Sequence, residues 1–478
     1  MTQTEEKMST QSKLILFILI LGNFLCLISE TVMNVALPSI ISDFHIRTSS
    51  AQWLTTGYML VIGISVPVSA FLIQRFTLRQ LFVTAMSFYL IGSFIGFITP
   101  WFSLLFVGRM IQALGTGIIL PLVMSTMLTL VPVSKRGTVM GIFSVAILFA
   151  PAIGPVLSGL IIQYYSWQII FLGLLIAAAL IFLFALFKLS NVSETSRPTI
   201  HIPSVILSTI GFGGVVYGFS AAGEETGWSN PIVWLTLIIG VIALALFVRQ
   251  QSKLNSPMIN MKPFRSSVFS RSIFLMFLIM MIQFSMMLIL PLYFQTAAGL
   301  SPLQTGFLML PGGVTLALTA MVGGRLFDKI GFKPLLLTGL VLLTIILSLF
   351  TTISSGTSTT TAAILYAAFT IGVGLSIGPV MTLALNQVPK PLHAHGSAIS
   401  NTINQVSGAI GPALYTSIMT MASQHFIQQS NETNKTLLQI KSMTTGVHTV
   451  YYVAIAFAVV SFLLALTLKK KDQQLETQ

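Results

Sequence analysis

The chain has 478 residues, of which 54% are apolar and only 7% are charged, and its mean hydropathy is +0.91. A water-soluble protein carries about 25% charged residues because its surface needs them. This composition therefore excludes a soluble globular protein and indicates an integral membrane protein. The net charge of +13 comes from basic residues that stand singly or in small groups between apolar runs. Because they form no basic domain, the charge does not indicate that the chain binds nucleic acid. The single cysteine, Cys26, excludes an intrachain disulfide and a multi-cysteine metal site.

Fourteen runs of the chain are long and apolar enough to cross a bilayer, for which about 20 residues are needed. The first run has no small-residue cleavage site, so we expect a retained helix rather than a signal peptide. The runs are too long for barrel strands and do not alternate, so they predict an all-α polytopic membrane protein. In chain order the runs are 14–37, 51–74, 80–99, 102–128, 137–162, 167–188, 203–222, 231–249, 272–295, 304–326, 335–353, 362–386, 397–422 and 447–468.

The distribution of lysine and arginine predicts the orientation of these spans. With the N-terminus inside, 20 of the 24 basic residues fall in inside segments, three fall outside (Arg47, Lys435 and Lys441), and Arg109 lies within a span. Positive residues concentrate on the cytoplasmic side of membrane proteins. The pattern therefore predicts that both termini are cytoplasmic and that the number of spans is even, although twelve or sixteen spans would preserve it as well.

Two patterns recur at a nearly constant distance along the chain. The Gly-Pro pair at 154–155 recurs 257 residues later at 411–412, and the loop motif that ends at Lys333 has a degenerate copy, 254 residues earlier, that ends at Arg79. Such spacing predicts parallel repeats of six helices each, with the two middle spans as an inserted hairpin. The predicted organisation is an N-terminal tail 1–13, a six-helix bundle 14–190, a hairpin 203–249, a linker 250–271, a second six-helix bundle 272–468 and a C-terminal tail 469–478.

Several motifs support a resemblance to a known family. They are the stretches 31–38 (TVMNVALP), 52–58 (QWLTTGY), 109–112 (RMIQ) and 208–223 (STIGFGGVVYGFSAAG), and in the fifth span the series Gly141, Ala150, Pro151, Gly154, Pro155, Ser158 and Gly159. On these motifs the chain resembles a fourteen-span member of the major facilitator superfamily, in the drug:proton antiporter branch of EmrB/QacA-like multidrug exporters, and within it the lincomycin-resistance (Lmr-type) subgroup. In that pattern Ala150 and Ser158 stand where glycine is usual.

The resemblance implies two six-helix bundles plus two extra helices, alternating access, a location in the bacterial cytoplasmic membrane, no cofactor and a monomeric protein. The chain offers no Walker lysine motif, no hydrolase serine motif and no zinc-protease motif. His393 and His395 alone do not make a metal site. We therefore expect a transporter rather than an enzyme.

Glu30 and Arg109 are the candidate proton-coupling residues. Glu30 is the only one of eleven acids well inside a span, and Arg109 is the only intramembrane cation. Ionisable groups in a bilayer are costly and are functional candidates by default. Each lies seven residues from the outer end of its span, about 10 Å deep. We expect a conditional pair that opens when Glu30 is protonated or a cationic ligand competes, with Gln112 extending the polar route one turn deeper.

Two alternatives to this hypothesis stay open. Glu30 and Arg109 would also be explained by a static buried ion pair that orders two helices. The family usually places an aspartate one position before Glu30, where this chain has Ser29. If the helix is unbroken, that displacement turns the carboxylate by about 100°. The second alternative is therefore that the proton-binding role of the family's aspartate does not carry over to Glu30.

The antiporter series and the loop motif are candidate moving parts. Small residues let another helix approach closely, and Pro155 permits a bend, so the fifth span is predicted to be a hinge; ordinary helix packing is the alternative. The resemblance implies that the loop motif is a cytoplasmic gate. In such a gate Asp328 caps a helix or pairs with a basic residue. The alternative is a turn whose charges only fix the topology. The predicted gate residues are Arg75, Arg79, Gly324, Asp328, Lys329, Gly331 and Lys333.

Aromatic, methionine and amide side chains are candidates for a substrate cavity, because thioethers and flat rings accommodate varied apolar or cationic ligands. The alternative for each of these side chains is packing against lipid or a neighbouring helix. This alternative is weakest for Gln283, because its amide would be costly in lipid. The candidates are Phe24, Asn34, Trp53, Tyr58, Gln283, Phe284, Met287 and Tyr293.

We therefore predict a proton-coupled antiporter that exports amphipathic small molecules, such as lincosamide-type, cationic or lipophilic drugs. Its partners are those molecules, protons and the lipid bilayer. The alternative is a transporter of one physiological substrate (a lipid, a siderophore or a metabolite) whose drug export is incidental. A membrane enzyme or sensor would need a cluster of acids, histidines or thiols near one face, and the sequence contains none.

Overall fold

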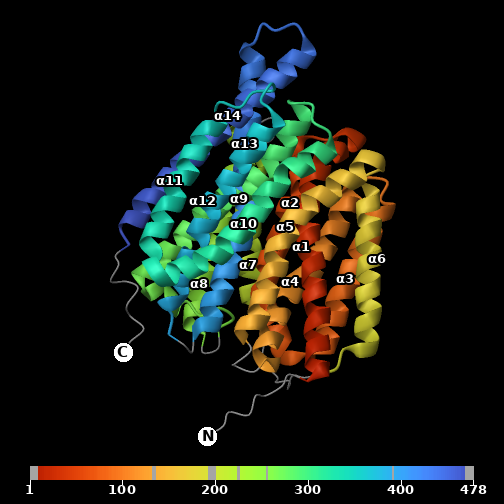
Figure 1. Cartoon of the computed structure of the whole chain (residues 1–478), viewed down its shortest axis with the longest axis vertical. Coiled ribbons are helices and arrows are strands. Elements are labelled where there is room, and N and C mark those ends of the chain that lie inside the picture. Colours follow the sequence, from red (N-terminus) through yellow and green to blue (C-terminus); the bar gives the residue numbers. More distant parts are fainter. Residues whose placement is uncertain are drawn as a thin grey trace.

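The computed structural model describes residues 9–131, 136–191, 201–222, 227–254, 257–389 and 392–468. For residues 67, 70, 128, 136–148, 321, 324, 325, 328, 329 and 394 it describes the backbone alone. Within these ranges the chain is entirely helical, without strands. Figure 1 shows long helices that run side by side, with both chain ends on the same side of the molecule.

Fourteen long α-helices make up the described chain, and each coincides with one of the fourteen predicted runs. The first six are α1 (Thr10–Phe44), α2 (Thr48–Arg75), α3 (Leu78–Ile98), α4 (Phe102–Leu130), α5 (Arg136–Tyr164) and α6 (Gln168–Lys188). The next two are α7 (Ile202–Ala221) and α8 (Pro231–Lys253), and the last six are α9 (Ser267–Thr296), α10 (Pro302–Ile330), α11 (Phe332–Phe350), α12 (Thr359–Asn386), α13 (His393–Gln429) and α14 (Lys435–Leu466). Short 3₁₀ turns, η2 (Gly227–Ser229) and η3 (Lys262–Arg265), precede α8 and α9.

Local sequence fixes several helix ends. Thr77 and Ser301 each form a capping box with the glutamine three residues on, which satisfies amide groups that the first turn of a helix leaves free. Gly331 has a φ of 80° and is the only residue between α10 and α11. Glycine adopts that conformation without steric cost, so it permits a direct turn from one helix into the next.

The contacts of α1–α6 recur among α9–α14. In the first set α3 packs on α4 and α6, and α1 packs on α5; in the second set α11 packs on α12 and α14, and α9 packs on α13. The two sets meet through α2 with α13 and through α5 with α10. Below, the helices α1–α6 are called the N-half and the helices α9–α14 the C-half. The hairpin α7–α8 packs on itself, and α7 also contacts both α2 and α13, so it lies where the two halves meet.

Eleven helices of the described chain are long and apolar enough to cross a bilayer by length and composition. The exceptions are α2, α5 and α13, although the described part of α5 includes the shorter apolar stretch Phe149–Tyr164. All three take part in the contacts between the halves, α2 with α13 and α5 with α10.

The two halves are packed tightly at the side of the molecule opposite the chain ends. The Gln295 amide donates to the carbonyl of Val35, 3.1 Å away, and so joins α9 to α1. A methyl group on Gly306 of α10 would lie 2.7 Å from the carbonyl oxygen of Pro155, and one on Gly159 would collide with the carbonyl of Pro302. Close packing of this kind between α5 and α10 leaves no space for side chains larger than glycine.

Candidate functional site

Arg109 of α4 is completely buried and held by neutral groups. Its Nη1 donates to Ser29 Oγ at 2.9 Å and to Gln112 Oε1 at 2.6 Å, and its Nε donates to the carbonyl of Leu54 at 3.3 Å. Its guanidinium also lies over the ring of Tyr58, 3.9 Å from the centroid. Cation–π contact of this kind is strongest where water is excluded. The other terminal nitrogen, Nη2, has no partner among the described residues.

The network continues from Arg109 to the neighbouring helices of the N-half. Gln112 also donates to Ser93 Oγ of α3 at 2.8 Å, so it connects α4 with both α1 and α3. The hydroxyl of Tyr58 bonds Thr116 of α4 at 2.7 Å. Gln112 therefore belongs to a hydrogen-bonded network that ties four helices together, and its role in a polar route stays a prediction.

Glu30 lies beside this network without joining it. Its side chain is 7% exposed, and no hydrogen bond or ion pair to it occurs in the part of the chain that the structure describes. In particular, no nitrogen of Arg109 lies within 4.0 Å of its carboxylate. The residue that points at Arg109 is Ser29, because one step along a helix turns the side chain by about 100°. Glu30 and Arg109 are thus not paired in this structure, and a conditional pair between them stays a prediction.

α5 contacts both halves through its small residues. A methyl group on Gly154 would collide with Thr31, the neighbour of Glu30 on α1. On the opposite side, Ala152 lies against Gly313 of α10, and Pro155 lies against Gly306. Ala150 and Ser158 are fully buried, Pro151 is half-buried, and the side chain at position 141 lies outside the described set. The antiporter series therefore provides close approach on two faces, as tight helix packing requires.

Two predicted gate residues cap helices of their own half. Arg79 donates through Nη2 to the carbonyl of Leu186 at the end of α6, at 2.7 Å. Lys333 donates to the carbonyls of Leu466 and Leu468 at the end of α14, at 3.2 and 2.9 Å. A cation at a helix C-terminus stabilises the unpaired carbonyls there.

In the described chain, the hydrogen bonds of Arg79 and Lys333 stay within one half each. A latch would need bonds that cross between the halves. Arg75 lies exposed in the last turn of α2. Gly331 forms the turn between α10 and α11. For Gly324, Asp328 and Lys329 the structure describes the backbone alone, so a gate built on Asp328 stays a prediction.

The candidate cavity residues of the N-half have different surroundings. Tyr58 lies inside the Arg109 network, with no exposed surface. Trp53 packs against Phe106 of α4 and Tyr217 of α7, so its ring contacts the inserted hairpin. Asn34, one turn beyond Glu30 on the same face of α1, is 4% exposed. Phe24 is half-buried against the core. Of these four, only Asn34 shares the face of Glu30.

In the C-half the candidates gather around α9 and α13. Phe284 lies against Gly408, 3.1 Å from the position of a methyl group there, and Met287 is 5% exposed. Gln283 Oε1 and the Tyr293 hydroxyl are buried and have no partner among the described residues. The structure thus brings Phe284 to the surface that α13 shares with α2.

Sequence reasoning missed several buried polar atoms without partners. On α13 these are Asn404 Oδ1 and Gln405 Oε1, and on α1 it is Asn23 Nδ2. Buried polar groups normally have hydrogen-bond partners, so unpaired ones mark places where a ligand or water completes the bonding. Their signal in the sequence was an amide within an apolar span, the same signal that singled out Gln283.

Two repeated sets of six helices and an inserted hairpin, with a carboxylate and an arginine network buried in the N-half, define a polytopic membrane transporter. The chain belongs to the Major Facilitator Superfamily, whose family model matches residues 19–412. It is a multi-pass protein of the cell membrane, as the relatives and the apolar helices indicate.

The chain is 40% identical to "Lincomycin resistance protein LmrB" of Bacillus subtilis over 98% of each chain. It is 25% identical to "Multidrug transporter protein MdtP" of the same organism, over 81% of this chain and 71% of that protein. Among solved structures, a bacterial homolog of the human lysosomal transporter Spinster superposes with a TM-score of 0.68 at 16% identity, over 97% of this chain and 98% of that one. A D-xylose-proton symporter superposes with a TM-score of 0.65, also at 16% identity, over 96% and 98%. These likenesses support the fold, and the sequence relatives support a transporter rather than an enzyme.

Proposed function

We propose that this protein is a proton-coupled antiporter that exports amphipathic small molecules by alternating access. In this proposal all fourteen helices span the membrane, both termini are cytoplasmic, and the bundles 14–190 and 272–468 rock against each other. The names of the relatives, lincomycin resistance and multidrug transport, support drug-like substrates. The 20-to-3 division of basic residues supports the orientation.

The observation that carries the proposal is the position of Glu30. A carboxylate buried in a span and free of partners in the described chain has a high cost when ionised, so it takes up a proton readily. Arg109 lies nearby, bonded to neutral acceptors only. When Glu30 ionises, attraction draws the guanidinium from Ser29 toward the carboxylate; when Glu30 is protonated, Arg109 returns to Ser29 and Gln112. The proton thus selects between two arrangements of α1 and α4.

A chain of close contacts provides a route from Glu30 to the other half. Thr31, the next residue along α1, lies against Gly154 of α5. One residue further along α5, Pro155 lies against Gly306 of α10. Because these contacts leave no free space, a shift of α1 at Glu30 requires α5 to move, and α5 in turn displaces α10. Protonation would in this way favour one of the two orientations of the bundles.

Substrate recognition in this proposal belongs to the C-half and the face of α1 that carries Asn34. The unpaired amide oxygens of Gln283 and Gln405 accept hydrogen bonds. Phe284 and the methionines near it provide an adaptable apolar surface. This combination suits amphipathic molecules that carry ammonium or hydroxyl donors.

The proposal is tested by transport in proteoliposomes with imposed pH and voltage gradients. Glu30→Gln keeps the size of the side chain and removes its titration, so we expect proton-driven transport of lincomycin or a cationic dye to fall to the level of empty vesicles. Glu432→Gln is the matched control, since Glu432 lies in the loop between α13 and α14, where its carboxylate bonds Lys441 and the backbone of Asn434. It should transport like the wild type.

The result that would overturn the proposal is proton-driven transport by Glu30→Gln at the wild-type rate. A panel of substrates in the same vesicles decides the breadth of specificity. Transport of several unrelated amphiphiles at similar rates supports multidrug export. Transport of one lipid, siderophore or metabolite far above all drugs would instead support a transporter with a single physiological substrate.

A further inference from the structure

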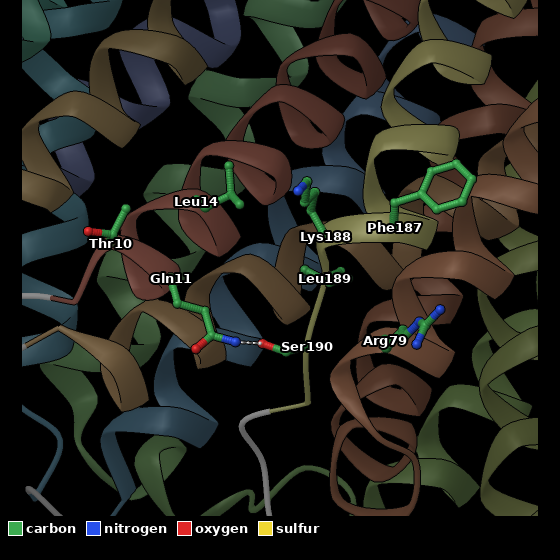
Figure 2. Close-up of a pocket in the computed structure, with 8 residues that line it drawn as sticks. All are labelled: Thr10, Gln11, Leu14, Arg79, Phe187, Lys188, Leu189 and Ser190. Atoms are coloured by element: carbon green, nitrogen blue, oxygen red, sulfur yellow. Dashed lines mark hydrogen bonds between the residues drawn. The ribbon is translucent and has the colours of Figure 1, made fainter.

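A pocket of about 450 Å³ opens on the surface of the N-half, on the side of the molecule where the chain ends lie. It is bordered by the first turns of α1, the start of α3 and the end of α6. The Gln11 amide donates to Ser190 Oγ at 2.7 Å, and Figure 2 shows this bond closing one side of the pocket. The pocket is far along the helices from Glu30, so it is separate from the candidate transport site.

Two cations give the pocket a positive charge. Arg79 and Lys188 both line it, and none of its lining residues is acidic. The Lys188 ammonium has no partner in the described part of the chain, and Arg79 uses one terminal nitrogen on the Leu186 carbonyl, which leaves its other guanidinium donors available. The N-terminus of α1, which begins at Thr10, adds partial positive charge at the same place. These groups together suit a phosphate.

An exposed apolar stripe leads from the membrane-facing surface of α6 to the pocket. Leu180, Leu183, Phe184 and Phe187 are all exposed, and the Phe187 ring, which also lines the pocket, is 81% exposed. Their spacing of three and four residues places them on one face of the helix. A ligand with a phosphate in the pocket and an alkyl chain along this stripe would satisfy both surfaces at once.

We infer that this pocket binds the headgroup of an anionic phospholipid, with one acyl chain lying along α6. Basic pockets between membrane helices hold such headgroups through charge and hydrogen bonding. A free phosphate or a soluble phosphate ester has the same anionic chemistry but would make no use of the apolar stripe. The inference rests on the location of the chain in a bilayer and does not depend on proton coupling or on the identity of the transported molecule.

The test measures lipid adducts on the purified full-length protein by native mass spectrometry. Phosphatidylglycerol is the probe, and phosphatidylcholine is the zwitterionic control. We expect phosphatidylglycerol to bind in preference to phosphatidylcholine, and Lys188→Gln to weaken that binding about fivefold, the effect of one cation near a membrane surface. Lys188→Arg should retain it. Lys13→Gln, a change of an exposed lysine on the same side of the molecule that does not line the pocket, should have no effect.

A second variant distinguishes a lipid from a soluble phosphate. Phe187→Ser removes the end of the apolar stripe and leaves both cations in place, so it should weaken binding of long-chain phosphatidylglycerol more than that of glycerol phosphate. Competition by millimolar glycerol phosphate equal to that of the lipid would overturn the assignment to a lipid. Equal phosphatidylglycerol adducts on the wild type and Lys188→Gln would overturn the site itself. Because Lys188 and Phe187 are exposed, neither change is expected to prevent folding.

Discussion

The N-half and the C-half share neutral hydrogen bonds but differ in charge. In the N-half Tyr58 of α2 bonds Thr116 of α4, and in the C-half Thr315 of α10 bonds Thr370 of α12 at 2.8 Å, 254 to 257 residues later. The cation that caps the last helix is repeated as well, at positions 79 and 333. The Glu30 and Arg109 pair is not repeated: no charged residue occurs on α9 from 272 to 296 or anywhere on α12.

We expect the features that recur in both halves to serve the fold and those that occur in one half to serve function. Bonds that recur in both halves position helices and require only that donors and acceptors match. Among the described residues the buried charges, Glu30 and Arg109, occur only in the N-half, and because ionisable groups in a bilayer are costly we expect them to have a function. The C-half instead carries more unpaired neutral atoms in its described residues, among them those of Gln283, Tyr293 and Gln405. We therefore expect proton coupling to depend on the N-half and substrate affinity on the C-half.

The largest expected effect comes from removing the cation of the N-half. Arg109→Ala removes the hydrogen bonds from the guanidinium to Ser29, Gln112 and Leu54, and a hydrogen bond to a charged group contributes about 1.5–3 kcal/mol. We expect transport to be lost and the folded yield to fall sharply, measured by size-exclusion chromatography and thermal unfolding in detergent. Thr370→Ala removes the neutral Thr315–Thr370 bond of the C-half, the counterpart of the Tyr58–Thr116 bond. This change should lower the free energy of unfolding by only about 1 kcal/mol.

Arg109→Lys separates folding from function in the same experiment. Lysine keeps the charge but lacks the planar fork that reaches Ser29, Gln112 and Leu54 together. We expect it to fold better than Arg109→Ala and still transport poorly. Wild-type transport by Arg109→Ala would show that the charge of the N-half has no role in coupling.

The next effect tests the register of the carboxylate on α1. In the double variant Ser29→Asp with Glu30→Gln, the acid moves to the position whose side chain already lies 2.9 Å from Arg109. If coupling needs a carboxylate beside Arg109, this variant should recover a substantial part of the transport that Glu30→Gln alone loses. The measurement is uptake into proteoliposomes under a fixed pH gradient, with Glu30→Gln as the reference. No recovery would mean that the face of α1 that Glu30 occupies is itself required.

The sequence predicted the helices well because the bilayer dictates their length. All fourteen runs coincide with helices, but α13 extends from His393 to Gln429, whereas the run was 397–422. The apolar composition marks the part that lies in the membrane, and the polar end of the helix continues past it. In Figure 1 the outer ends of α13 and α14 project beyond the other helices. An apolar window therefore cannot define where a helix ends when the last turns leave the bilayer.

The site was predicted less completely, since a sequence shows a residue type but not the direction of its side chain. Scarcity of charge singled out Glu30 and Arg109, but their direct pairing depended on a rotation about α1 that only the structure shows. Ser93 gave no signal, because a serine hydroxyl in a membrane helix can bond its own backbone, as Ser93 does to the carbonyl of Tyr89. Trp53, an expected cavity residue, packs against Tyr217 of α7, a contact that arises only when the inserted hairpin folds back, and its place in a cavity stays a prediction.

The smallest expected effect belongs to the neutral chemistry of the C-half. Gln405 is 6% exposed on α13, next to the contact with Gly63 of α2, and its amide oxygen has no partner in the described chain. Gln405→Leu keeps most of the volume and removes the acceptor, so substrates with an ammonium or hydroxyl donor should show a KM about fivefold higher, the value of one net hydrogen bond. Substrates without donors should be unaffected, and the dependence of transport on the pH gradient should stay that of the wild type. A change in the pH dependence with KM unaltered would place coupling, rather than substrate affinity, in the C-half, and would remove the division of roles between the halves.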